Sequence, residues 1–282
     1  MNKDKVAYGL IYLSASISVL LLLSLITYVF IKGIGVINWS FLTSVTSAYR
    51  GTIGLAGNIV NTLLIIFITL LIGLPVGIGS AIYLNEYAKN KKFVSLIEYC
   101  TETLSGLPSI IFGLFGMMFF GQTLGLGYSI LCGCLTLILM ILPLIVRNTQ
   151  EALKTVPQLY RDGALSLGSG KWHMIRTVVL PSCINGIITG VILAIGRIVS
   201  ESAALLFTAG SGKLLLKKLS LGSLYKKLFE SGGTLAIQLY LSATVEGDFS
   251  TAFGIALILI IIVLAINLSA KTITNSIEKK KG

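Results

Sequence analysis

Long runs of apolar residues without a charged side chain constrain this chain more than any other feature. Residues 6–31 carry no charge and are bracketed by Lys5 and Lys32, and residues 103–146 are also free of charge. An α-helix needs about 20 apolar residues to cross a bilayer, so the first run predicts one span and the second, interrupted by glycines at 121–127, predicts two. Only 12% of the residues are charged, whereas soluble domains carry about 25%. The sequence predicts an all-α integral membrane protein with six transmembrane helices, at about 6–31, 59–84, 104–120, 128–146, 184–207 and 251–270.

Glycine and proline inside these spans predict close helix contacts and bends. Gly73, Pro75 and Gly77 lie in the second span, and Leu107-Pro108-Ser109 lies in the third. Glycine lets two helix backbones approach, and proline removes one backbone hydrogen bond. Ordinary helix packing is a sufficient explanation for most of them.

Lysine and arginine in the connecting segments predict the orientation. With six spans, both ends of the chain lie on the same side. If that side is the cytoplasm, the inner segments carry 14 Lys and Arg and the outer segments carry 7. The outer residues are Lys32, Arg50, Lys213, Lys217, Lys218, Lys226 and Lys227. Because cytoplasmic loops are enriched in these residues, we expect a multi-pass protein of the cell membrane with cytoplasmic termini and no nucleic-acid partner.

A polar segment, residues 147–181, separates the fourth span from the fifth on the predicted cytoplasmic side. Pro157 suits the first position of a helix, which is expected to run to about residue 167. Gly168 and Gly170 can adopt the left-handed conformation that ends a helix.

A second short helix is expected at 171–179, stopped by Pro181 before the fifth span. Two short helices joined at a glycine form a compact knob that can fill a cleft on a partner. The alternative is an amphipathic pair that lies on the membrane surface, with Trp172 among the lipid headgroups.

Two ionisable residues, Arg197 and Glu201, fall inside the fifth span. They are four residues apart, so on a continuous helix they share a face and are expected to pair. Each costs about 2.5 to 3.5 kcal/mol to insert, which favours a position in the bundle interior. The pair either fixes helix packing or lines a solute path, in which the guanidinium can hold an oxyanion through two hydrogen bonds.

The loop residues resemble the coupling signature of ABC importer permeases, in which E-A-A, three residues, G, nine residues and I-x-L-P follow one another. Asp162 replaces the glutamate of that signature, Gly163 replaces an alanine and Val178 replaces the isoleucine. In that family this loop is the surface through which an ATPase subunit drives the membrane subunit. The resemblance therefore implies an ATPase-coupling loop that contains Asp162, Gly163, Ala164, Gly168, Leu180 and Pro181.

The fifth span resembles one stretch of phosphate ABC permeases, R-x-x-G-E-T-A-P-L-L-F-T-A. It aligns with residues 197–209, where Ser200, Ser202 and Ala204 replace a glycine, a threonine and a proline. Residues 81–87, 105–113 and 234–240 also match, and the chain is more similar to the A-type subunit of the two phosphate permeases. The resemblance implies the type I ABC importer permease fold over residues 58–270, after an N-terminal helix and external loop (1–57) and before a basic cytoplasmic tail (271–282).

The same resemblance implies the function and the partners. The chain is expected to be a permease subunit that translocates inorganic phosphate, with Arg197 and Glu201 in the substrate pathway. Its expected partners are a homologous second permease that completes a heterodimer, two ATPase subunits, an external phosphate-binding protein and the lipid bilayer. The competing readings are a permease for sulfate or molybdate and a proton-coupled secondary transporter.

The sequence itself offers no nucleotide, metal or catalytic site. Gly168-Ser-Gly-Lys171 and Gly210-Ser-Gly-Lys213 lack the first glycine and the final Ser or Thr of a phosphate-binding loop. The four cysteines have no metal-binding pattern, and we expect them to pack as small apolar residues. No cofactor is therefore expected in this chain, and ATP and magnesium are expected on the partner ATPase.

Overall fold

The computed structural model describes residues 2–47, 52–213 and 221–279. Of the basic residues counted above, Arg50, Lys217 and Lys218 lie outside the described residues, as does the end of the predicted tail, 280–282. The elements, in chain order, are α1 (Asn2–Ile34), α2 (Trp39–Thr43), β1 (Val45–Ser47), β2 (Thr52–Leu55), α3 (Ala56–Ile82), η1 (Tyr83–Tyr87), α4 (Lys91–Ser105), α5 (Ser109–Gly116), η2 (Met117–Thr123), α6 (Ile130–Lys154), α7 (Gln158–Ser166), α8 (Lys171–Met174), η3 (Ile175–Val179), α9 (Leu180–Ser200), α10 (Ala203–Thr208), α11 (Leu221–Leu228), α12 (Leu235–Thr244) and α13 (Phe249–Lys279), where η marks a π-helical turn.

Within the described residues, five helical segments are long and apolar enough to cross a membrane, and a bent pair of helices raises the number to six. They correspond to the predicted spans, which confirms the all-α membrane fold. The long segments are Asp4–Ile34, Ala56–Tyr87, Ile130–Lys154, Lys171–Ser200 and Phe249–Thr272. A small antiparallel pair, β1–β2, lies outside this class, and in it Val45 lies opposite Leu55.

The third predicted span, 104–120, is not a continuous helix. The chain forms α4 and then the segment Ser109–Thr123, and the two meet at an angle of 99°. Pro108 stands at the N-terminus of α5. It lacks a backbone N–H and disfavours a helical conformation at the preceding residue. The bend that the sequence predicted at this proline is therefore a complete break between two helices.

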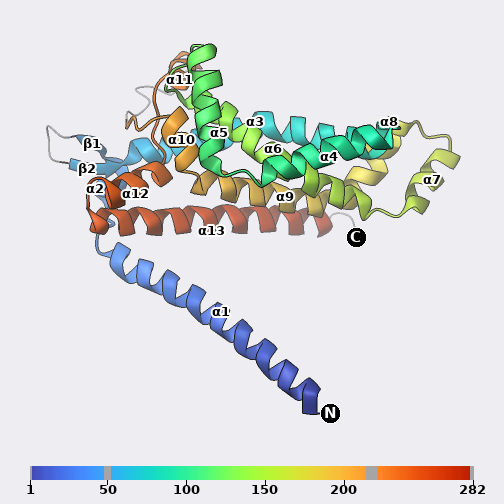
Figure 1. Ribbon diagram of the computed structural model, residues 1–282, viewed down its shortest axis with the longest axis horizontal. Helices are drawn as coiled ribbons and strands as arrows, with labels where there is room; N and C mark the ends of the chain where they lie inside the picture. The colour runs from blue at the N-terminus through green and yellow to red at the C-terminus, as the bar shows by residue number, and fades with distance from the viewer. Residues whose placement is uncertain (1, 48–51, 214–220, 280–282) are drawn as a thin grey trace.

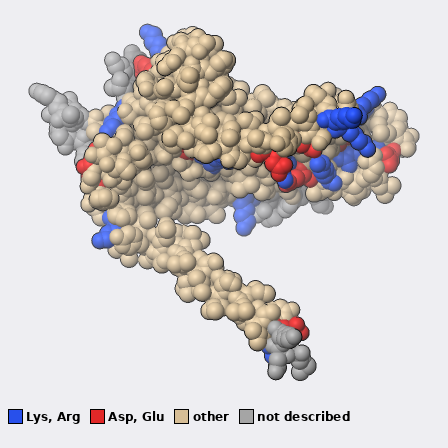
Figure 2. All heavy atoms as spheres, viewed as in Figure 1, with Lys and Arg blue, Asp and Glu red and all other residues tan. Residues whose placement is uncertain are grey.

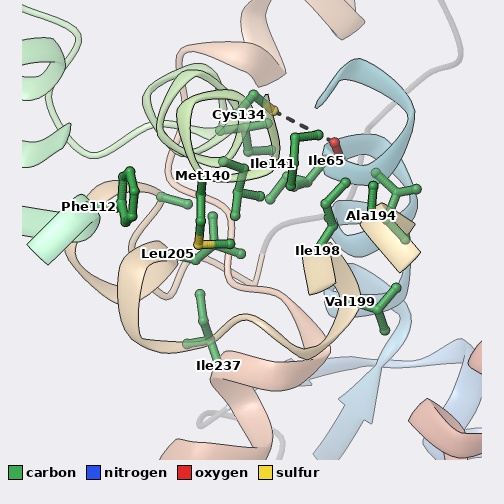
Figure 3. Packing of buried hydrophobic residues seen from close by; sticks show 14 of the residues in the cluster. Ile65, Phe112, Cys134, Met140, Ile141, Ala194, Ile198, Val199, Leu205 and Ile237 are labelled. Atoms are coloured by element: carbon green, nitrogen blue, oxygen red, sulfur yellow. Dashed lines mark hydrogen bonds between the residues drawn. The ribbon is translucent and has the colours of Figure 1, made fainter. Parts of the chain in front are cut away.

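Four helices, α3, α6, α9 and α13, run side by side along the length of the molecule (Figure 1). Helix α6 contacts both α3 and α9 and contributes most to the main apolar cluster, which Figure 3 shows at close range. An added Cβ at Gly77 would approach Ile145 of α6 to 2.6 Å. The close helix contact predicted for this glycine is confirmed, because a larger residue would push α3 and α6 apart.

Helix α1 leaves this bundle and extends away from it (Figure 1). Near its C-terminal end Gly33 lies against the backbone of Phe253 in α13. The remainder of its apolar surface is exposed, as is appropriate for a segment surrounded by lipid or by a neighbouring subunit.

The two ends of the bundle differ in character. One end carries β1, β2, α10, α11 and α12, and the other carries α7 and α8 (Figure 1). At the first end the buried Asn58 and Asn61 of α3 donate side-chain hydrogen bonds to the Gly233 carbonyl, at 3.0 and 3.2 Å. These bonds fasten the segment between α10 and α12 to α3.

Candidate functional site

Helix α7 and its glycine end form the first half of the predicted knob. Pro157 immediately precedes the helix, with φ −58°. After the helix, Gly168 has φ +82°. The Gly168 N–H donates to the Leu165 carbonyl and the Ser169 N–H donates to the Ala164 carbonyl, at 3.0 and 3.2 Å. This pair of bonds is a Schellman motif, which requires a left-handed residue at the position of Gly168. The prediction for Gly168 is confirmed, whereas Gly170 is extended, with φ −67°.

The second half of the knob differs from the prediction. Pro181 does not stop the helix that begins at Lys171, because α8, η3 and α9 form one continuous helical segment, Lys171–Ser200. The Leu180 N–H donates to the Ile175 carbonyl, which closes a wide π-type turn just before the proline. Such a turn redistributes the backbone hydrogen bonds that a proline interrupts. The knob and the fifth span therefore share one helical rod.

The outer surface of α7 presents exposed leucines beside exposed polar residues such as Gln158 and Asp162. Leu159 is 76% exposed and Leu167, just after the helix, is 90% exposed. Asp162, Gly163 and Gly168 are also exposed, and Ala164 is half-buried against the neighbouring core. Figure 2 shows that charged side chains gather near this end of the molecule, whereas most of the bundle surface carries none. An apolar surface in charged surroundings has the character of a protein-docking site.

Arg161 is the one residue of α7 that is buried. Its guanidinium points inward and forms an ion pair with Glu86, at 3.1 Å. The sequence showed Arg161 only as one more basic residue of a polar loop, and its partner lies 75 residues earlier. The one available signal was a carboxylate, Glu86, directly after the apolar run of the second span.

Arg197 and Glu201 are not on one helix face, and the predicted pair does not form. Helix α9 ends at Ser200, and Glu201 is extended, with φ −77° and ψ 120°. The Glu201 side chain is 9% exposed, and its Oε1 accepts the backbone N–H of Ala204 at 3.0 Å. The carboxylate thereby satisfies an otherwise free N–H at the start of α10.

The Arg197 side chain is half-buried near the end of α9. In the part of the chain that the structure describes, no acceptor lies within hydrogen-bonding distance of its guanidinium. Its neighbours Ala194, Ile198 and Val199 belong to the main apolar cluster (Figure 3), so its backbone position is fixed. A guanidinium carried on such a backbone position can bind an oxyanion through two parallel hydrogen bonds.

The helix break beside Arg197 is supported by close packing. Gly113 of α5 lies against α10, and an added Cβ would approach the Ala204 Cα to 2.8 Å. Ala204 occupies the position of the proline in the signature that residues 197–209 resemble. The chain still breaks at 201–202, because the Glu201 cap and the contact with α5 hold α10 in place.

Comparisons with known proteins identify the family. Residues 73–282 match the model of the binding-protein-dependent transport system inner membrane component. The chain is 38% identical to the probable ABC transporter permease protein YqgI of Bacillus subtilis, over 98% of this chain and 97% of that protein. It is 32% identical to the phosphate transport system permease protein PstA of Xylella fastidiosa (strain 9a5c), over 86% and 82% of the two chains.

Solved structures agree on the fold. A bacterial alginate ABC transporter, in complex with its alginate pentasaccharide-bound periplasmic protein, superposes with a TM-score of 0.71 at 14% identity, over 98% of this chain and 96% of that one. The MetNI methionine ABC transporter superposes with a TM-score of 0.60 at 17% identity, over 79% and 94%. The chain belongs to the inner membrane component family of binding-protein-dependent transport systems, and it is the permease subunit of an ABC importer, not an enzyme.

Proposed function

We propose that this permease subunit translocates inorganic phosphate. The observation that carries the proposal is the Arg197 guanidinium, which has no acceptor among the described residues and extends from a closely packed membrane span. The relatives of this chain include phosphate permeases. A guanidinium presents several N–H donors in one plane, which match the geometry of a phosphate. Because Glu201 is engaged by the Ala204 N–H, it does not compete with the anion for these donors.

The remaining parts of the importer follow from the same proposal. A homologous second permease completes the translocation path, and an external phosphate-binding protein delivers the anion. The complex contains two ATPase subunits, which bind ATP and magnesium. The knob formed by α7 and α8 is the surface on which an ATPase subunit docks. Asp162, Gly163, Ala164, Gly168, Leu180 and Pro181 belong to the segment that couples the ATPase to the membrane helices. The knob and both termini then lie in the cytoplasm.

The test is phosphate uptake into liposomes that contain the complete complex. Arg197→Ala is expected to abolish uptake while the complex still assembles, because the half-buried side chain makes no hydrogen bond to residues 2–47, 52–213 or 221–279. Arg147→Ala is the matched control, since Arg147 forms an exposed surface ion pair with Glu102. Normal uptake by the Arg197 variant refutes the proposed path.

Two further arms separate the competing solutes and mechanisms. Inhibition of phosphate uptake by sulfate or molybdate, at equal concentrations, identifies a permease for another oxyanion. Uptake driven by a pH gradient into liposomes holding this chain alone identifies a secondary transporter. The proposal predicts neither result. It predicts phosphate uptake that depends on ATP and on the partner subunits.

A further inference from the structure

Helix α7 has an inverted distribution of residues. Its leucines face outward, and its single buried residue is an arginine. A helix that is held to a protein by apolar packing buries its apolar stripe instead. The exposed leucines are available to a partner, so Arg161, together with the packing of Ala164, attaches α7 to the bundle.

The Arg161 guanidinium joins three parts of the bundle end. Its Nε and Nη2 donate to Glu86 Oε1, at 3.2 and 3.1 Å. Nη2 also donates to the Leu153 carbonyl at 2.9 Å, and Nη1 donates to the Val156 carbonyl at 2.6 Å. Glu86 lies in η1 at the end of α3, Leu153 lies in the last turn of α6, and Val156 lies in the turn before α7. The carbonyls at a helix C-terminus have no partner within the helix and favour a cation.

A second cation attaches the other half of the knob to the same end of α3. The Lys171 ammonium donates to the backbone carbonyl of Glu86. It also lies over the ring of Tyr87, 4.9 Å from the centroid. These two side chains are polar links between the end of α3 and the knob, and they lie beside an apolar cluster that contains Ala81, Met174 and Ile175.

Stability alone does not explain a buried ion pair at this position. Both side chains are nearly enclosed, 10% and 7% exposed. The desolvation of two charges offsets much of their attraction, and apolar residues of similar volume often serve as well. The pair instead fixes the orientation of α7 relative to the bundle, because a guanidinium with several simultaneous acceptors has one permitted orientation.

We propose that the Arg161–Glu86 pair is a positioning strut that fixes the knob against α3, so that displacement of the knob by the ATPase moves the membrane helices. This inference rests on the proposed function, which names inorganic phosphate as the transported solute. Without the strut the ATPase still docks on the outer surface of α7, but the knob yields and the membrane helices do not follow. Lysine at position 161 keeps the charge and cannot reach Glu86 and both carbonyls together.

The first experiment measures phosphate imported per ATP hydrolysed by the complete complex in liposomes. For Arg161→Lys this ratio is expected to fall by about twofold to thirtyfold, the range found for residues that couple distant sites. Glu86→Gln is expected to have a smaller effect, because its amide oxygen still accepts from Arg161. Arg147→Lys, in the exposed pair with Glu102, is the matched control and leaves the ratio unchanged.

A double-variant comparison tests whether the two residues act as one link. If they do, Arg161→Ala combined with Glu86→Ala lowers the ratio no further than the more severe single variant. Losses that multiply contradict a single link. A variant complex that fails to retain its ATPase also overturns the proposal, because the pair is then part of docking.

A second experiment needs neither ATP nor phosphate. Spin labels at Phe67→Cys in α3 and Leu167→Cys beside α7, in a Cys100→Ser background, report the distribution of distances between the bundle and the knob in nanodiscs. Both labelled sites are exposed, and Cys132, Cys134 and Cys183 are buried. Arg161→Lys is expected to broaden this distribution and Arg147→Lys is not. An unchanged width overturns the strut, whereas a wild-type complex that imports no phosphate overturns only the proposed cargo.

Discussion

Two glycines of the knob offer a matched test of how this loop is built. Gly163 lies inside α7, and Gly168 follows it in the left-handed conformation, with φ +82°. An added Cβ would meet no atom within 4 Å at either position. Substitution by alanine therefore changes only the backbone preference, and the same chemical change is expected to have opposite effects at the two positions.

The expected magnitudes follow from the backbone alone. An L-residue in the left-handed conformation costs about 1–2 kcal/mol, so Gly168→Ala weakens the end of α7 by that amount. Glycine inside a helix costs about 0.5–1 kcal/mol relative to alanine, so Gly163→Ala strengthens α7. Because the strain at Gly168 is confined to the loop, the membrane bundle is expected to remain folded in both variants.

Amide hydrogen exchange of residues 158–170, measured in nanodiscs, reports both changes directly. Local opening is expected to increase about fivefold to thirtyfold in Gly168→Ala, as 1–2 kcal/mol requires. Opening is expected to decrease about twofold to fivefold in Gly163→Ala. Exchange at the wild-type rate in Gly168→Ala refutes the role assigned to the Schellman motif. If the exchange rate shifts in the same direction in both variants, the backbone argument is wrong. The added methyl groups must then make contacts that the structure does not show at these two positions.

The remaining predictions concern helix packing and a helix start. Gly116→Val would place an atom 2.0 Å from Thr136 Oγ1, so it is expected to lower the thermal midpoint of the detergent-solubilised protein through overpacking of about 1–3 kcal/mol. Asp248→Ala removes two hydrogen bonds from Thr251 at the start of α13 and is expected to cost about 1 kcal/mol. Those bonds hold the pKa of Asp248 below its usual 3.8. The stabilisation is therefore present above that pH and is lost as the pH falls through the folded pKa, where the thermal midpoints of wild type and Asp248→Ala converge.

The long apolar runs without charged residues predicted most of the membrane helices. A helix that crosses the bilayer needs such a run whatever its tertiary contacts are. The third span shows the limit of that argument. Residues 91–105 precede Pro108 and carry several charges, yet they form a helix that packs on α6 through ion pairs such as Lys154–Glu98. Hydropathy cannot detect a helix whose polar face is turned toward a neighbouring helix. The direction of the break at Pro108 likewise depends on what α5 packs against.

The knob was predicted from its proline and glycines, and its attachment to the bundle was not. Gly168 is visible in the sequence because its role is local and requires only a left-handed backbone. The role of Arg161 depends on Glu86, which only the fold brings to it, and on the carbonyls of Leu153 at the end of α6 and of Val156 in the turn before α7. A charged residue in a polar loop has no sequence pattern that distinguishes an exposed side chain from a buried one.

Glu201 shows why helix geometry must be known before intramembrane charges are paired. A carboxylate removed from water needs a donor, and four-residue spacing offers Arg197 as that donor. The helix ends between the two residues, and the first free N–H of the next helix, that of Ala204, meets the carboxylate instead. A continuous helix would have joined the two charges and occupied the guanidinium. The break separates them, so the donors of Arg197 have no acceptor in the described part of the chain, as the proposed phosphate path requires.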